Sequence, residues 1–342
     1  MTEQWGQGAF SFDVAAEWAK LPAEIVLGDV AGIAVDRRDR VYLFNRGEHP
    51  VVVMDRTGGF ITSWGHGLFT NAHGASIGAD DAIYLTDNGD HTVRKFSLDG
   101  RLLLQIGEPK KPAAFMSGRP FCRCTHTALS PKGDIYVSDG YGNAAVHRFA
   151  PDGRHLASWG RPGSGPGEFN LPHNIACDAD GWVYVADREN HRVQVFDGHG
   201  RYETQINNMH RPSGMAITPG PCPHCIVGEL APYQPVNRLT PNLGPRISIL
   251  DRSGKLVSRI DRGKGAGLEP GQFVSPHAIA LDSHGDMYVG EVAATDWLAV
   301  FPDQPKPAAL GRFQKFTRVA ASKAGEPDET TAAAGAGGGK EG

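Results

Sequence analysis

The chain repeats one pattern of hydrophobic and polar positions. An apolar stretch precedes a turn of the type Asp-x-x-Gly or Asp-x-x-Asp, which is followed by a Val-Tyr-Val-like stretch, a polar turn and two further apolar stretches. Residues within each stretch alternate in character, as is typical of short β-strands. The clearest copies are IAVDRRDRVYLFNR (33–46), SIGADDAIYLTDNGDHTVRKF (76–96), ALSPKGDIYVSDG (128–140), IACDADGWVYVADRENHRVQVF (175–196) and AIALDSHGDMYVGE (278–291). A further copy begins with GMAITPG (214–220), is interrupted by an insertion and resumes at RISILDRSGKLVSRI (246–260).

Six copies of a four-strand unit predict an all-β fold, a six-bladed β-propeller, because each copy has the length of a propeller blade. We expect the blades to start near residues 32, 74, 126, 174, 214 and 278, within a single domain spanning residues 1–319. In the sixth copy, WLAVF (297–301) is the expected third strand, and no fourth strand follows it. The segment Phe12 to Val26 is therefore expected to supply that strand and close the ring.

Composition narrows the classes of partner. The net charge of −4 comes from interspersed charges, without the basic stripe of a nucleic-acid surface. The sequence contains neither a signal-peptide pattern nor a membrane-spanning apolar run, so a cytoplasmic protein with a small-molecule substrate is expected, with no nucleic-acid or membrane partner. Nothing in the sequence indicates an oligomeric state. The segment 320–342 has almost no large apolar residues and is expected to be disordered.

Three histidines occupy one repeat position in alternate copies. The residues just before the first apolar stretch of each copy are Ala31, His73, Thr125, His173, Ser213 and His277. Because the first strand of each blade lines the channel, His73, His173 and His277 are expected to meet near the axis. Three imidazoles with a fourth position open are typical of a catalytic zinc site, although imidazole also suits iron, cobalt or manganese. His126 follows the aligned position, and strand alternation predicts that it points away from the axis.

Six longer motifs follow one another in blade order along the sequence. They are Phe-Asn-Arg-Gly-Glu-His (44–49), Ala-His-Gly-Ala-Ser-Ile (72–77), Val-Ser-Asp-Gly-Tyr-Gly-Asn (137–143), Leu-Pro-His-Asn-Ile (171–175), Val-Ala-Asp-Arg-Glu-Asn (185–190) and Ser-Pro-His-Ala-Ile (275–279). Together they resemble the peptidyl-α-hydroxyglycine α-amidating lyases, a family of six-bladed propellers, from about Gly32 to Val300. The single blade motifs also resemble NHL repeats.

The resemblance implies a zinc ion (Zn2+) on the three histidines and cleavage of the C–N bond of an α-hydroxyglycine into an amide and glyoxylate. It implies that Tyr141 and Arg46 are catalytic and that Arg188, with Arg46, binds substrate. Zinc suits a small α-hydroxyamide because it can lower the pKa of the substrate hydroxyl. The two arginines suit it because an arginine can hold a carboxylate with two parallel hydrogen bonds.

The sequence departs from the family at three positions, which are Gly142, Ser275 and Ala278. The family's calcium ion (Ca2+) would here be bound by the carbonyls of Ile33 and Ala75, but its aspartate ligand is replaced by Ala278, which argues against a calcium site. A methionine of the family's pocket is replaced by Ser275, which is expected to change the substrate that this wall binds.

The cysteines fit a reducing compartment. The family's disulfide would join the positions of Cys122 and Gly142 and cannot form. The pairs Cys122/Cys124 and Cys222/Cys225 are expected to be free thiols, with a structural zinc or a redox pair as alternatives.

Three functions stay open. The first is a zinc-dependent C–N lyase acting on a small α-hydroxyamide to give an amide plus an aldehyde or keto acid; a peptide-amidating role is not expected. The second is a hydrolase or hydratase using the same three histidines. The third is a non-enzymatic propeller that binds a partner, and the ring of histidines at the axis argues against it.

Overall fold

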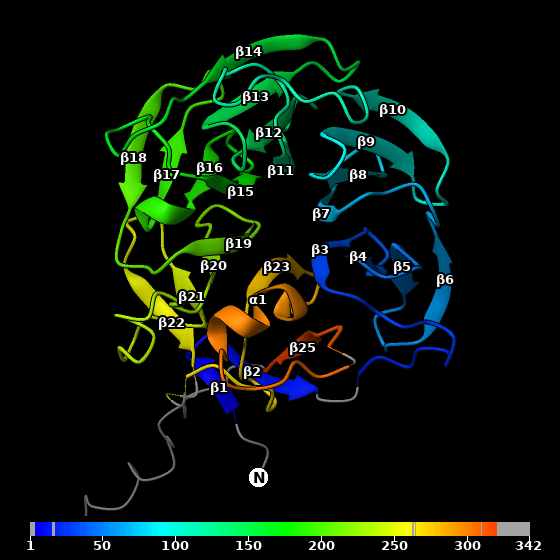
Figure 1. Ribbon diagram of the computed structural model, residues 1–342, viewed down its shortest axis with the longest axis vertical. Helices are drawn as coiled ribbons and strands as arrows, with labels where there is room; N and C mark the ends of the chain where they lie inside the picture. Colours follow the sequence, from blue (N-terminus) through cyan, green and yellow to red (C-terminus); the bar gives the residue numbers. More distant parts are fainter. Residues whose placement is uncertain (1–3, 16–17, 262, 264, 309, 320–342) are drawn as a thin grey trace, which may run out of the picture.

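The computed structural model of the protein confirms a six-bladed β-propeller (Figure 1). It describes residues 4–15, 18–261, 263, 265–308 and 310–319. Six antiparallel sheets surround a central channel, and the first strand of each sheet lies innermost (Figure 1). Within the described part of the chain, no helix has the length and hydropathy needed to cross a bilayer. The tail expected to be disordered lies outside the described residues.

The first five blades each contain four consecutive strands. Blade one comprises β3 (Val30–Val35), β4 (Val41–Asn45), β5 (Val51–Met54) and β6 (Phe60–Trp64). Blade two comprises β7 (Ala72–Ile77), β8 (Ala82–Asp87), β9 (Thr92–Ser97) and β10 (Leu102–Ile106). Blade three comprises β11 (Cys124–Leu129), β12 (Ile135–Asp139), β13 (Ala145–Phe149) and β14 (His155–Trp159).

Blade four comprises β15 (Pro172–Cys177), β16 (Val183–Asp187), a 3-10 helix η1 (Arg188–Asn190), β17 (Arg192–Phe196) and β18 (Tyr202–Ile206). Blade five comprises β19 (Pro212–Ile217), β20 (Cys225–Glu229), β21 (Arg246–Leu250) and β22 (Leu256–Ile260). The insertion predicted in this blade connects β20 to β21. The inner strand of every blade begins two residues before the start expected from the sequence.

The sixth blade closes the ring with both ends of the described chain. Its sheet runs in the order β23 (Pro276–Leu281), β24 (Met287–Glu291), β25 (Phe313–Arg318), β2 (Phe10–Ala15) and β1 (Gln4–Gln7). The N-terminal region therefore supplies the fourth strand, as expected, but from Phe10–Ala15 rather than from the whole of Phe12 to Val26. The expected third strand at WLAVF is wrong: these residues belong mainly to helix α1 (Ala293–Val300), and Phe313–Arg318 forms the third strand.

The Asp-x-x-Gly part of the repeat has a structural cause. Asp178 accepts hydrogen bonds from the amides of Asp180 and Trp182 and from the Tyr184 hydroxyl, at 2.9–3.1 Å. Asp36 and Asp282 are bonded in the same way in blades one and six. Each carboxylate thus closes the turn between the first two strands and satisfies a buried tyrosine, which explains why the motif recurs.

Ring closure depends on apolar packing between the two chain ends. Phe12 on β2 and Phe316 on β25 are buried and lie edge to face, with ring centroids 6.4 Å apart. We expect Phe12→Ala to lower the free energy of unfolding by about 3–5 kcal/mol, because it leaves a cavity in a well-packed core. Ile61→Ala on the exposed strand β6 is the control, with little expected change. Equal denaturant midpoints for the two variants would contradict a stabilising role for the packing between β2 and β25.

Candidate metal centre

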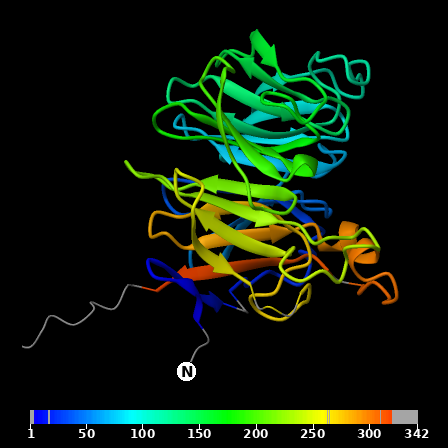
Figure 2. The ribbon, with the colours of Figure 1, turned by 90° about the vertical axis from the view of Figure 1, so that its left-hand side faces the viewer.

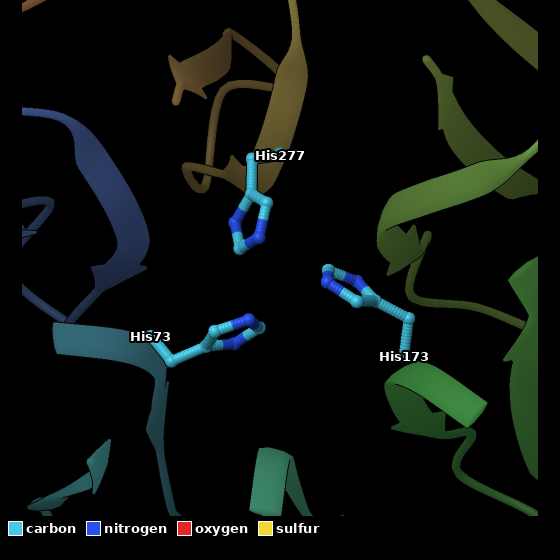
Figure 3. A group of neighbouring side chains, drawn as sticks. All are labelled: His73, His173 and His277. Carbon is cyan, nitrogen blue, oxygen red and sulfur yellow. The ribbon is translucent and has the colours of Figure 1, made fainter. Parts of the chain in front are cut away.

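The three predicted histidines meet in the central channel. Each is the second residue of an inner strand: His73 of β7, His173 of β15 and His277 of β23. Their imidazole centroids lie 4.6–4.9 Å apart, and their ligand atoms all lie within 4.8 Å of one another. Figure 3 shows the three rings converging from three sides of the channel. All three side chains are buried, so this is a closed cluster and not a chance group of surface histidines.

Each imidazole is oriented by the carbonyl of the next blade. The Nδ1 atoms of His73 and His277 lie 2.6 Å and 2.8 Å from the carbonyl oxygens of Thr125 and Ala31, and that of His173 lies 3.4 Å from the carbonyl oxygen of Ser213. A carbonyl only accepts, so Nδ1 carries the proton and Nε2 keeps a free lone pair. The three blades without a histidine at this position therefore fix the tautomers of the three that have one.

A second set of contacts fixes the loops that carry the histidines. In the three blades that carry the histidines, an acidic residue ends the second strand and accepts hydrogen bonds from backbone amides just before the inner strand. Asp187 accepts from the amide of Asn170 at 2.7 Å, and Glu291 accepts from those of Val274 and Ser275 at 2.6 and 3.0 Å. Asp87 does the same for the amides of Thr70 and Asn71. The acidic residue at the end of the second strand was the sequence signal for this anchoring of the loops, and we did not predict it.

Burial keeps the histidines neutral. It lowers the pKa of His73 and His173 well below the usual value and that of His277 to about 3, and the charges of Arg46 and Arg188 act in the same direction. Neutral imidazoles with free nitrogen lone pairs are the form that binds a metal. The donor set therefore fits one divalent ion with three nitrogen ligands, and zinc is the metal most typical of it.

Tyr141 lies directly beside this cluster. Its hydroxyl is 3.3 Å from Nε2 of both His73 and His173. The glycines on either side of it allow this approach: a Cβ at position 140 would lie 2.1 Å from the Pro172 carbonyl oxygen, and one at position 142 would lie 2.3 Å from Cys122 Sγ. The Gly-Tyr-Gly sequence thus lets the loop lie flat over the inner strands and directs the phenol to the histidines.

The two predicted arginines are held by different parts of the chain near the cluster. Arg188, in η1, donates from Nη1 to the Tyr141 hydroxyl at 3.2 Å and pairs with Glu189 at 2.8 Å. Arg46 donates from Nε to the Ala72 carbonyl at 3.1 Å and from Nη1 to Thr295 Oγ1 at 2.8 Å, and it lies 3.4 Å from Asp29. Both guanidinium groups are therefore held in place by protein partners.

Several neighbours of these arginines were not predicted. Arg211 pairs with Glu189 at 2.9 Å and stacks on Tyr233, with its guanidinium carbon 4.0 Å from the ring centroid. Ser275, predicted to bind substrate, is fully buried and donates its hydroxyl to Asp296 on α1 at 2.5 Å. Asp296, Thr295 and Tyr233 lie in single-copy insertions, so the repeats carried no signal for them.

The two residues whose carbonyls would bind the family's calcium ion, and His126, also lie on inner strands. Ile33 and Ala75 are buried in β3 and β7, and Ala278 brings no carboxylate to them. The expectation that His126 points away from the axis is wrong. A β-bulge between Cys124 and His126 breaks the alternation, and the His126 imidazole lies in the inner ring with Nδ1 3.2 Å from the carbonyl oxygen of Ile175.

The cysteines are all unpaired. Cys122 and Gly142 lie in contact where the resemblance implies a disulfide, so the absent second thiol alone prevents one. Among the described residues, the three channel histidines are the only group of three or more that could hold a metal, and no such group includes Cys222 or Cys225.

The close packing of the inner strands predicts an effect on the metal centre. A Cβ on Gly74 would lie 2.7 Å from the Thr125 carbonyl oxygen, which orients His73. We expect Gly74→Ala to weaken zinc binding about 10–100-fold, the usual cost of disturbing a group that orients a ligand. Gly165→Ala, where a Cβ would meet only the flexible end of Glu168, is the control. Competition with a chelating dye measures both affinities, and a wild-type affinity for Gly74→Ala would contradict this role of the carbonyl.

Comparisons with known proteins agree with the fold. An NHL repeat model matches residues 169–196, within blade four. The chain is 30% identical over 312 residues to NHL repeat-containing protein 3 of Mus musculus, an alignment that covers 86% of this chain and 85% of that protein. Among solved structures, it superposes on a streptogramin B lyase with a TM-score of 0.59 and 14% identity, over 90% of this chain and 97% of that one.

Sequence relatives also include amidating enzymes. The chain is 30% identical over 262 residues, 69% of its length, to peptidyl-α-hydroxyglycine α-amidating lyase 1 of Drosophila melanogaster. It spans 45% of that lyase and 33% of peptidyl-glycine α-amidating monooxygenase B of Xenopus laevis. The resemblance read from the motifs is thereby confirmed at the level of the family.

Proposed function

The chain belongs to the NHL-repeat β-propeller family that includes the peptidyl-α-hydroxyglycine α-amidating lyases, and from this premise we propose that it is a zinc-dependent carbon–nitrogen lyase. Its substrate is a small α-hydroxyamide, and its products are an amide and an aldehyde or keto acid. One observation carries the proposal: three neutral imidazoles face one point, and the Tyr141 hydroxyl lies 3.3 Å from Nε2 of two of them.

The metal has a limited and defined part in this proposal. His73, His173 and His277 would hold it through Nε2, since their Nδ1 atoms are bonded to carbonyls. When bound, a zinc ion lowers the pKa of a hydroxyl close to it. An α-hydroxyamide carries such a hydroxyl on the carbon bonded to nitrogen.

The protein's own residues position the substrate and move the proton. Arg46 and Arg188 can bind a substrate carboxylate, because each is anchored through other nitrogens and neither Nη2 has a hydrogen-bond partner within the described residues. As the hydroxyl loses its proton, its oxygen forms a double bond to carbon and the C–N bond breaks. The electron pair goes to nitrogen, which takes up a proton. Tyr141 is the proposed group that transfers it.

Two other functions explain these observations less completely. A hydrolase or hydratase would need the same histidines but would attack the amide carbonyl or a double bond with water. A partner-binding propeller would leave the cluster of histidines and Tyr141 without a role. The similarity to NHL repeat-containing protein 3 favours neither, because its name states no activity.

N-acetyl-α-hydroxyglycine separates these functions in one reaction. The lyase releases acetamide and glyoxylate, whereas a hydrolase releases acetate. The zinc-loaded protein is incubated with this compound, and acetamide and acetate are quantified by NMR against the spontaneous reaction. We expect acetamide and glyoxylate in equal amounts. Acetate as the product would support the hydrolase, and neither product above background would refute catalysis on this substrate class.

A further inference from the structure

Helix α1 is an insertion that lies beside the metal centre. Residues 292–312 separate the second and third strands of blade six, whereas residues 46–50 alone separate the corresponding strands of blade one. In Figures 1 and 2 the helix lies on one face of the propeller, next to β23 and the channel. The repeat does not require this segment, so its contacts point to a role in the site.

The contacts of α1 attach it to two parts of the site. The amide of Val292, at its start, donates to the Ser275 carbonyl at 3.1 Å, two residues before His277. Thr295 accepts from Arg46 at 2.8 Å, and its hydroxyl donates to Asp29. Trp297 is buried beneath the helix. The first turn of α1 is therefore held firmly against the strand that carries a metal ligand and against a substrate-binding arginine.

Asp296 is the one acidic side chain that this turn directs toward the arginines. Its Oδ2 accepts from Ser275, and its Oδ1 has no hydrogen-bond partner within the described residues. No cation of the described chain lies within 4.0 Å of it, since Arg188 and Arg211 are paired with Glu189 instead. Burial raises the pKa of Asp296, while Arg188 and Arg211 are near enough to lower it. The Asp296 carboxylate is thus held by Ser275, two residues before His277, while Arg188 contacts Tyr141 beside the same histidines, and the two charged groups form no ion pair with each other.

A ligand that binds between Arg188 and Asp296 needs an acceptor for the arginine and a donor for the carboxylate. An α-hydroxyglycine supplies the acceptor through its own carboxylate. An N-acetyl substituent ends in a methyl group, which cannot donate a hydrogen bond to Asp296. An N-carbamoyl substituent ends instead in an NH2 group, which is of similar size and can donate one. We propose that Asp296 is a substrate-specificity residue, whose free oxygen accepts a hydrogen bond from the terminal NH2 of an N-carbamoyl-α-hydroxyglycine. This inference rests on the proposed function and refines its substrate class.

Unreactive analogues test this assignment without turnover. N-carbamoylglycine and N-acetylglycine lack the hydroxyl, cannot be cleaved, and differ only in NH2 against CH3. Calorimetry on the zinc-loaded protein is expected to give at least about tenfold tighter binding of the carbamoyl compound, the usual range for a hydrogen bond to a charged group. Asp296→Ala should reduce the affinity ratio to about one. Asp296→Asn, which keeps an acceptor oxygen, should retain part of it. Leu298→Ala, an exposed change on the same helix, should keep the wild-type ratio.

Equal affinities for the two analogues in the wild type, including no binding of either, would overturn the assignment. So would a preference that survives in Asp296→Ala. The acetamide assay distinguishes this failure from failure of the proposed function. Turnover of N-acetyl-α-hydroxyglycine without discrimination between the analogues refutes the role of Asp296 alone, while the absence of any α-hydroxyamide turnover refutes the function on which it rests.

Discussion

Replacement of His173 by alanine is expected to remove the metal and all measurable lyase turnover. Disturbing a group that merely orients a ligand costs about 10–100-fold in metal affinity, so loss of one of three ligands costs more than this. Two imidazoles cannot compensate, because both are oriented by carbonyls of other blades and cannot move toward a new partner. Elemental analysis of the dialysed proteins measures the loss, with about one zinc per chain expected in the wild type.

The control for this variant is His66→Ala, which removes an exposed histidine that is not one of the three in the cluster. It should retain zinc and turnover. Because His173 is buried, thermal unfolding of both metal-free proteins establishes that the variant is folded. A folded His173→Ala protein that keeps one tightly bound zinc would refute the channel site.

Tyr141→Phe is expected to lower kcat by about 10²–10⁴-fold, the usual contribution of a general acid or base. Zinc binding should persist, because Tyr141 contacts the Nε2 atoms but none of the carbonyls that orient the rings. The two effects separate a proton-transfer role from a structural one. The removed hydroxyl also accepts a hydrogen bond from Arg188, so KM is expected to rise modestly.

Arg123→Ala is a useful comparison for Tyr141→Phe. Its guanidinium carbon lies 5.2 Å from the centroid of the Tyr141 ring, and within the described residues no hydrogen bond joins it to the three channel histidines. A small change in kcat is expected. If Tyr141→Phe had full turnover, or if both variants lost activity equally, the proton transfer assigned to Tyr141 would be wrong.

The proposed metal centre depends on closure of the ring. The His277 imidazole donates to the carbonyl of Ala31, so this bond joins blade six to blade one. Strand β2 from the N-terminal region pairs with β25 and completes blade six, the blade that carries His277. Detachment of β2 should therefore release the metal before the other blades unfold.

The regular parts of the molecule could be predicted from the sequence. Blade number and the meeting of His73, His173 and His277 follow from one repeat, because equivalent positions in a ring lie at equal distances from its axis. The same reasoning failed for WLAVF, since an apolar stretch of five residues fits either a strand or a helix. It failed for His126 because a bulge in the inner strand does not alter the hydrophobic pattern.

The single-copy features were beyond sequence reasoning. Tyr141 and Arg188 were identified by resemblance alone, since a tyrosine or an ion pair in a turn is common in any propeller. Asp296 and Tyr233 belong to insertions without a repeat or a motif, and only the folded chain brings them beside Arg188 and Arg211. The repeat thus determines where the three candidate metal ligands lie, and the insertions supply charged and aromatic residues near them.

The most direct test of the whole account is a titration of the metal-free protein with zinc while acetamide release from N-acetyl-α-hydroxyglycine is followed. We expect turnover to rise in proportion to added zinc and to stop rising at one equivalent per chain. Binding of one equivalent without any acetamide release, or acetamide release that is independent of zinc, would contradict it.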